Sequence, residues 1–213
     1  ETSALMMQCP GMKPAHLVAT LDLPGCGKSK ESFQLNTMTN MKADVLDVID
    51  YVCKNYAVDE TRIGAFGYSM GGRITLELLA EGKYSFSTIE LVAPAEDLTD
   101  LKNLFGGAEK WDTMKAEANE KGYAEFTTVY GQKQQLSKAW FADLEKYSDG
   151  LVEKAAENYT GDSHRLAAVH GNFGHARITA LFVIVRTCAK SRHGQRCTEQ
   201  CLPKIYYFHR VEC

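Results

Sequence analysis

The residue pattern with the clearest chemistry is Gly67-Tyr68-Ser69-Met70-Gly71, in which one serine stands between two glycines. An apolar, strand-like stretch at 62–66 precedes it, and a stretch with helical apolar spacing at 72–80 follows. A serine at a sharp turn from strand to helix is a nucleophile elbow, because the strained turn presents the hydroxyl and leaves no room for side chains two positions away. The pattern therefore predicts that Ser69 is a catalytic nucleophile.

A serine nucleophile needs three kinds of helper group. A base takes the hydroxyl proton, a second group orients the base, and N–H donors stabilise the oxyanion. The backbone N–H of Met70, the residue after the serine, is one such donor in this motif. Ser69 and Met70 thus supply two parts of the machinery.

The composition favours one medium-sized α/β domain over residues 1–213. The chain is 45% hydrophobic, which is enough to bury a core without disulfides or metal ions. Its formal net charge of −3 provides no basic field, so we expect neither nucleic acid nor a membrane as a partner. No apolar run is long enough to span a bilayer, and residues 1–7 lack the features of a signal peptide. We therefore expect a soluble, cytoplasmic protein.

Strand-like and helical segments alternate through the first half of the chain. Apolar runs at 17–21, 62–66 and 88–94 predict strands, and the apolar spacing of 39–54 and 72–80 predicts helices. This alternation is typical of a mostly parallel sheet with helices on its faces. The predicted fold class is therefore α/β.

Residues at about 98–148 differ in character and predict an insertion that forms a lid. Segments that leave the carboxyl ends of parallel strands overhang the site of an α/β enzyme. The aromatic residues of the lid either line a substrate cleft or form a small core of their own. They are Trp111, Tyr123, Phe126, Tyr130, Trp140 and Phe141.

Two further segments accompany the serine motif. Asp22-Leu23-Pro24-Gly25-Cys26-Gly27-Lys28-Ser29 precedes it, and Val169-His170-Gly171-Asn172-Phe173 follows it. In this order the three segments resemble the turn after the fourth strand, the elbow and the end of the seventh strand of α/β-hydrolases of the small esterase type, which include cinnamoyl and feruloyl esterases. The resemblance covers roughly residues 17–173, and the lid also matches the layout of that family.

The resemblance implies a carboxylic ester hydrolase that works through an acyl-enzyme on Ser69. Its substrates would be small-molecule esters of short acyl or aryl type, such as cinnamoyl and feruloyl esters, and it would need no cofactor and no metal ion. The family's His-Gly pair, whose loop gives the second oxyanion donor, has no counterpart, because this chain starts after that point of the fold. We therefore expect an N-terminally truncated fold, whose exposed sheet edge would favour homo-oligomers.

The remaining triad positions depart from the family pattern. After Val-His-Gly-x-x the family places the triad aspartate, and this chain has Gly174 there. Asp97, after the sixth strand, stands where some α/β-hydrolases carry the acid, although an aspartate there also suits a helix cap. The family's histidine follows its eighth strand. Because His209 follows a strand-like run near the end of the chain, it is our choice of base over His175 and His193.

The loss of resemblance from Gly174 onward suggests a hypothesis about the tail. If the coding sequence once read Asp-Thr-His-Val-Ser after Phe173, one inserted G would produce Gly-His-Ala-Arg-Ile, the residues at 174–178. A shifted reading frame would also explain the Cys, Arg and His content beyond that point. An alternate frame closed by early stop codons would contradict this hypothesis.

Two other function classes compete with the esterase. Gly25-Cys26-Gly27-Lys28-Ser29 resembles part of a phosphate-binding P-loop, but the full pattern needs a glycine where the chain has Asp22. The other class is a catalytically impaired hydrolase-fold protein, kept as a binding module or arising as a cloning artefact. Gly174 favours that second class, because a triad without its acid loses most of its activity.

The cysteines favour neither a disulfide framework nor a metal site. Seven is an odd number, which argues against a closed set of disulfides. Cys197 and Cys201 with His193 and His209 lack the spacing of a standard zinc module. We therefore expect no structural zinc.

Overall fold

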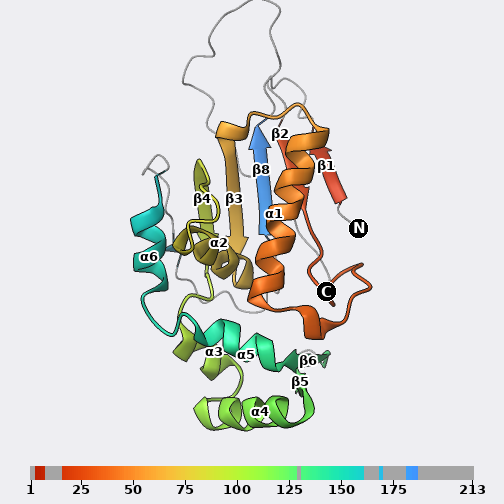
Figure 1. The fold of residues 1–213 in the computed structure, drawn as a ribbon, viewed down its shortest axis with the longest axis vertical. Helices are drawn as coiled ribbons and strands as arrows, with labels where there is room; N and C mark the ends of the chain where they lie inside the picture. Colours follow the sequence, from red (N-terminus) through yellow and green to blue (C-terminus); the bar gives the residue numbers. More distant parts are fainter. Residues whose placement is uncertain (1–2, 8–15, 129–130, 161–167, 170–180, 187–213) are drawn as a thin grey trace, which may run out of the picture.

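A six-stranded sheet carries the fold in a computed structural model of the chain (Figure 1). The structure describes residues 3–7, 16–128, 131–160, 168–169 and 181–186. The strands lie side by side in the order β1-β2-β8-β3-β4-β7. Their bounds are Ser3–Met7 for β1, His16–Thr20 for β2, Ile63–Tyr68 for β3, Thr88–Val92 for β4, Ala168–Val169 for β7 and Leu181–Arg186 for β8.

Four of these strands run in one direction. β3 pairs in parallel with β4, and β4 pairs in parallel with β7. β8 is antiparallel to both β2 and β3, so β2 runs the same way as β3, while β1 is antiparallel to β2. The carboxyl ends of β2 and β3 therefore lie at the same end of the sheet. This brings the loop at 22–29 and the serine motif to one side of the molecule.

Two long helices connect these strands. α1, Met38–Asn55, links β2 to β3 and begins after Thr37, whose side-chain oxygen accepts a hydrogen bond from the Asn40 N–H. α2, Met70–Ala80, links β3 to β4 and is buried from Gly71 to Leu79. The buried apolar face of α1 is the one that its spacing predicts. Its members are Met38, Met41, Val45, Val48, Ile49 and Val52. The short 3₁₀ helices are η1, Phe33–Leu35, and η2, Glu60–Arg62.

The insertion after β4 lies beyond the edge of the sheet toward which β3 points (Figure 1). Its elements are α3, Leu98–Leu104; α4, Ala108–Lys121; β5, Tyr123–Thr127; β6, Lys133–Ser137; and α5, Lys138–Glu145. β5 and β6 form an antiparallel hairpin. After α5, the helix α6, Leu151–Asn158, returns to pack beside α2.

The aromatic side chains of the lid pack on one another. The ring of Trp111 lies 5.4 Å from that of Trp140 and 5.1 Å from that of Phe141, measured between centroids. All three residues are at most 4% exposed. Phe105 joins the cluster with its centroid 5.2 Å from Trp140. Of the two interpretations that the sequence allows, the described aromatic residues thus support a core of the lid itself.

Three lysines surround Glu81 at the end of α2. Lys42 Nζ and Lys146 Nζ each lie 2.6 Å from Glu81 Oε1, and Lys83 Nζ lies 2.9 Å from Oε2. Burial alone would raise the pKa of Glu81, but the bonds from these lysines outweigh it and lower the pKa to about 2. Because Lys42 lies on α1 and Lys146 follows α5, the ionised carboxylate ties both elements to α2.

We predict a loss of stability in acid that depends on Glu81. A carboxyl group whose pKa is lowered by folding contributes stability above its unfolded pKa of 4.5, and this contribution disappears as the pH falls to about 2. Between about pH 6 and about pH 3, the free energy of unfolding should therefore fall more for wild type than for Glu81→Gln. Urea denaturation at both pH values measures the difference.

Asp50→Asn is the matched control, because Asp50 forms an exposed pair with Lys54. Exposed pairs contribute about 0–1 kcal/mol, so this variant should keep nearly all of the wild-type pH dependence. An equal loss of stability in wild type and Glu81→Gln would contradict the role given to Glu81.

Candidate active site

The serine motif forms a sharp corner between a strand and a helix. β3 ends at Tyr68 and α2 begins at Met70, so Ser69 alone makes the turn. Its backbone angles are φ 50° and ψ −116°, a conformation that residues other than glycine rarely adopt. Ser69 is partly exposed. The segment thus has the strand, the turn and the helix that a nucleophile elbow requires.

Backbone hydrogen bonds hold this corner against the segment after β4. The Ser69 N–H donates to the Val92 carbonyl at 3.0 Å, and the Ser69 carbonyl accepts from the N–H groups of Ala95 at 3.0 Å and Arg73 at 3.2 Å. Ala93 has a φ of 43°, and in the described part of the chain Ser69 and Ala93 are the non-glycine residues with positive φ. Ala93 lies between Val92 and Ala95, the residues that bond to Ser69, so these bonds hold both strained segments in place.

Glycine is required at two positions around the serine. A Cβ on Gly67 would lie 2.6 Å from the Gly71 carbonyl oxygen and 2.7 Å from Gly72 Cα. A Cβ on Gly72 would lie 2.7 Å from Pro94 Cβ. The need for a bare backbone at Gly67 confirms what the motif predicts. The need at Gly72 was not visible in the sequence, because it arises from the position of Pro94 after another strand.

Met70 is the first residue of α2, beside Ser69. Its N–H is among the first four amides of the helix, which have no acceptor within the helix, and the dipoles of the helix make this end positive. The Met70 amide therefore lies next to the serine at a helix end suited to a developing negative charge.

Asp97, the weak candidate for the triad acid, caps a helix. Its Oδ1 accepts a hydrogen bond from the Asp100 N–H at 2.8 Å, and α3 begins at the next residue, Leu98. The capping interpretation of Asp97 is therefore confirmed.

The other candidates for the triad lie outside the described residues. They are Gly174, His175, His193 and His209. In the described part of the chain Ser69 and Met70 lie side by side, and His209 as the base stays a prediction.

The loop after β2 binds its own carboxylate. The Lys28 N–H donates to Asp22 Oδ2 at 3.0 Å, and a Cβ on Gly27 would lie 2.3 Å from Asp22 Oδ1. A P-loop instead offers such amides to a phosphate and continues as a helix from its Lys-Ser pair. The first helical turn after this loop is η1, which begins only at Phe33. The P-loop alternative is therefore wrong.

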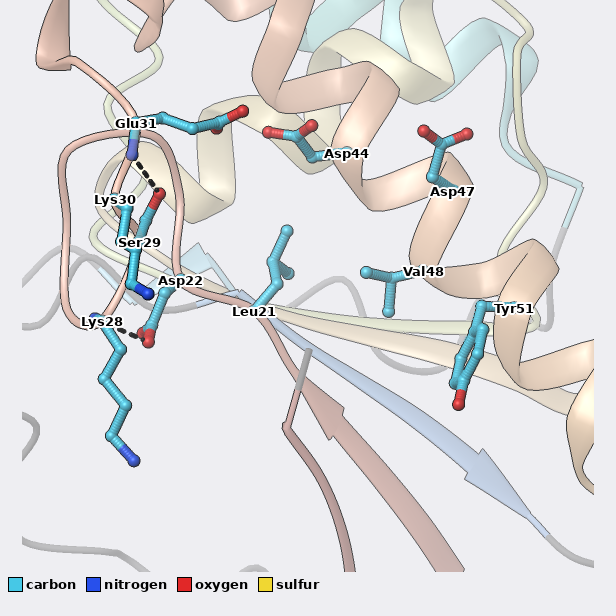
Figure 2. A pocket seen from close by; sticks show the side chains of 10 residues that line it. All are labelled: Leu21, Asp22, Lys28, Ser29, Lys30, Glu31, Asp44, Asp47, Val48 and Tyr51. Carbon is cyan, nitrogen blue, oxygen red and sulfur yellow. Dashed lines mark hydrogen bonds between the residues drawn. The ribbon is translucent and has the colours of Figure 1, made fainter. Parts of the chain in front are cut away.

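A cavity of about 710 Å³ lies between this loop and α1, and Ser69 is not among the residues that line it (Figure 2). Figure 2 shows the Glu31 carboxylate directed toward that of Asp44, with Asp47 farther along α1. Burial, then the charges of Glu31 and Asp47, raise the pKa of Asp44. Charged side chains line much of this cavity, and Ser69 is not among its lining residues. We therefore do not assign it as the binding site of the predicted ester substrate.

Neither a metal site nor a membrane span is found among the described residues. No group of three or more His, Cys, Asp or Glu side chains there is arranged to hold a metal ion. Cys197, Cys201, His193 and His209 lie outside the described part. Of the helices described, none is both long and apolar enough to cross a bilayer.

We predict that Gly67→Ala destabilises the fold through the elbow. The added methyl group meets backbone atoms that cannot turn away, so the free energy of unfolding should fall by about 1–3 kcal/mol, as measured by chemical denaturation. Gly82→Ala is the control, because a Cβ there meets no atom within 4 Å and adds only the strain of a φ of 61°. A smaller effect at Gly67 than at Gly82 would contradict the tight approach.

The prolyl oligopeptidase family (Peptidase_S9) matches residues 16–145 of the chain. Among solved structures, a presumed hydrolase from Agrobacterium vitis S4 is 23% identical, with 68% of this chain and 71% of that chain covered and a TM-score of 0.44. Est1E from Butyrivibrio proteoclasticus is 18% identical, with 74% of each chain covered and a TM-score of 0.42. No curated protein matches the chain. The sequence predicted a hydrolase of the α/β-hydrolase type, and the chain is one. Because the family match spans more than half of the 213 residues, the chain belongs to the prolyl oligopeptidase family.

Proposed function

We propose that the chain is a serine hydrolase that cleaves carboxylic esters of small molecules. The observation that carries this proposal is the strained corner at Ser69, which has a φ of 50° between β3 and α2. Such a conformation costs about 1–3 kcal/mol, and residues that keep it cluster at functional sites. Because the chain belongs to a hydrolase family, we propose that the residue at this corner, Ser69, is the nucleophile of a hydrolysis reaction.

In the proposed reaction, Ser69 Oγ attacks the acyl carbon while a base takes the hydroxyl proton. The carbonyl oxygen becomes an oxyanion that accepts a hydrogen bond from the Met70 N–H. The bond to the leaving alkoxide then breaks, and the alkoxide takes the proton from the base. Water repeats these steps on the acyl-enzyme and releases the carboxylic acid and Ser69. We propose His209 as the base, with His175 and His193 as alternatives.

The substrate class rests on the motif segments. The family name points to peptides as a competing class, whereas the turn at 22–29, the elbow and the segment at 169–173 resemble those of small esterases. The aromatic residues of the lid do not favour a cinnamoyl or feruloyl group, because Trp111, Trp140 and Phe141 are buried against one another. A short acyl ester is therefore the first substrate to test.

A catalytically impaired binding module is the second candidate. Gly174 favours it, because the family has its triad aspartate at that position. A serine without its acid keeps the elbow and the oxyanion donor but loses most of its activity. Covalent labelling of the serine separates the two candidates.

We predict that a fluorophosphonate probe labels wild-type protein at Ser69, as shown by peptide mass spectrometry. Ser69→Ala should abolish this label and lower the hydrolysis of p-nitrophenyl butyrate by about 10³-fold or more, because the nucleophile is removed. Ser29→Ala should leave both unchanged, since Ser29 is a partly exposed serine of the loop after β2 and does not belong to the elbow. Absence of the label from wild type would support the impaired binding module. Faster cleavage of peptide p-nitroanilides than of esters would change the proposed substrate class from esters to peptides.

We predict that His209→Gln lowers the rate of labelling and of ester hydrolysis by about 10³-fold, because the serine then has no group to take its proton. His175→Gln and His193→Gln are the matched variants and should stay within about threefold of wild type. A large loss in either of these variants, with His209→Gln near wild type, would move the base to that residue.

A further inference from the structure

Arg73 is a fully buried cation one turn along α2 from Ser69. Its Nε donates to Glu77 Oε1 at 3.0 Å. Its Nη1 donates to the carbonyl of Ala95 at 3.0 Å and is 3.4 Å from the carbonyl of Glu96. One edge of the guanidinium thus holds the segment that follows β4.

The other edge of the Arg73 guanidinium holds the end of the lid. Its Nη2 donates to the carbonyls of Leu144 at 2.8 Å and Tyr147 at 3.2 Å. α5 ends at Glu145, so the Leu144 carbonyl is one of the last four of the helix, which have no partner in the helix, and a cation is favoured at this end. Arg73 therefore joins the last helix of the lid to the helix that begins beside the serine.

Only arginine can make this set of contacts. The guanidinium offers five N–H donors in a rigid plane, whereas a lysine offers one compact ammonium group. The second oxygen of Glu77 accepts from Lys42 Nζ at 2.9 Å, so α1 holds the carboxylate that orients the arginine. The side chains of Arg73 and Glu77 are at most 1% exposed, so water does not compete for these bonds.

The segment held by Arg73 is the one that contacts the serine backbone. The Ala95 N–H donates to the Ser69 carbonyl at 3.0 Å, while the Ala95 carbonyl accepts from Arg73. Pro94 lies against Gly72, at a place where a Cβ on the glycine would be 2.7 Å from Pro94 Cβ. Residues 93–96 are thus held between the corner at Ser69 and the guanidinium.

The geometry assigns to Arg73 the role of a positioning residue for the nucleophile, a role that rests on the proposed function of Ser69. By holding residues 93–96 and the end of α5 on α2, Arg73 keeps the strained backbone of Ser69 in the conformation that presents its hydroxyl. Arg73 does not touch the substrate in this role. It acts through the backbone bond between Ala95 and Ser69.

Arg73→Lys tests this role, because it keeps the charge and a partner for Glu77 but cannot reach both pairs of carbonyls. The turnover rate with p-nitrophenyl butyrate and the rate of fluorophosphonate labelling should fall about 10- to 100-fold, as small displacements of reacting groups do. KM should stay within about twofold of wild type, since ground-state binding is not removed. Hydrogen exchange should accelerate in the peptides that cover 67–72 and 92–97.

Val52→Ala is the matched control, because it lowers stability through a cavity beside α1 and leaves Glu77 and the carbonyl contacts of Arg73 in place. We expect both variants to lower the melting temperature, but Val52→Ala should keep turnover within about threefold of wild type. Equal losses of turnover in the two variants would show a merely structural role and overturn the proposal. Wild-type hydrogen exchange at 92–97 in Arg73→Lys would overturn it as well.

Two further outcomes keep this test separate from that of the proposed function. If wild type is neither labelled nor active, the proposed function fails, and accelerated exchange confined to 67–72 and 92–97 in Arg73→Lys still decides whether Arg73 holds the corner. If Arg73→Lys does not fold, Glu77→Gln takes its place, because it keeps an acceptor for Arg73 Nε but removes the charge. The same readouts should then change in the same direction by a smaller amount.

Discussion

The buried guanidinium of Arg73 must find a partner for nearly every N–H group, because it has no contact with water and cannot lose its proton. Glu77 accepts from Nε, and the carbonyls after β4 and at the end of α5 accept from Nη1 and Nη2. An arrangement in which the lid moved away would leave the Nη2 donors of this guanidinium without their carbonyl acceptors, and an unsatisfied buried donor costs about 1–3 kcal/mol. This requirement couples the position of the lid to the position of the elbow helix.

The local parts of the fold follow from the sequence because their causes are local. The spacing of apolar residues predicts a helix at 39–54, and α1 spans Met38–Asn55. The glycine at Gly67 predicts the corner, because the turn itself excludes a side chain at that position. In both cases, the residues that determine the structure lie within a few positions of one another.

The contacts that join the elbow to the lid have no such signal in the sequence. Arg73 looks like one polar residue in a helix, and its partners are backbone carbonyls 22 and 71 positions away, which every residue possesses. The aromatic residues of the lid can be counted in the sequence, but whether they point to a cleft or to one another depends on how α4 and α5 pack. Likewise, the sequence analysis predicts no strand at 181–186, and in the structure β8 lies there, between β2 and β3. Long-range packing decides these features.

The glycine-rich loop after β2 is compatible with two structures, a P-loop that binds a phosphate and a loop that binds a carboxylate of its own chain. Successive amides around Gly25 and Gly27, both at positive φ, form a concave site for an anion, and in a P-loop that anion is a phosphate. Here the anion is the carboxylate of Asp22, the residue that breaks the P-loop pattern. The carboxylate of Asp22 therefore takes the place that a bound anion would occupy, and the loop needs no ligand to adopt this conformation. β2 and β3 end on the same side of the sheet, so this loop and Ser69 lie on one side of the molecule. Because the loop is bound to its own carboxylate, the segment after β4 is the part that we propose to position Ser69, through its contacts with Arg73.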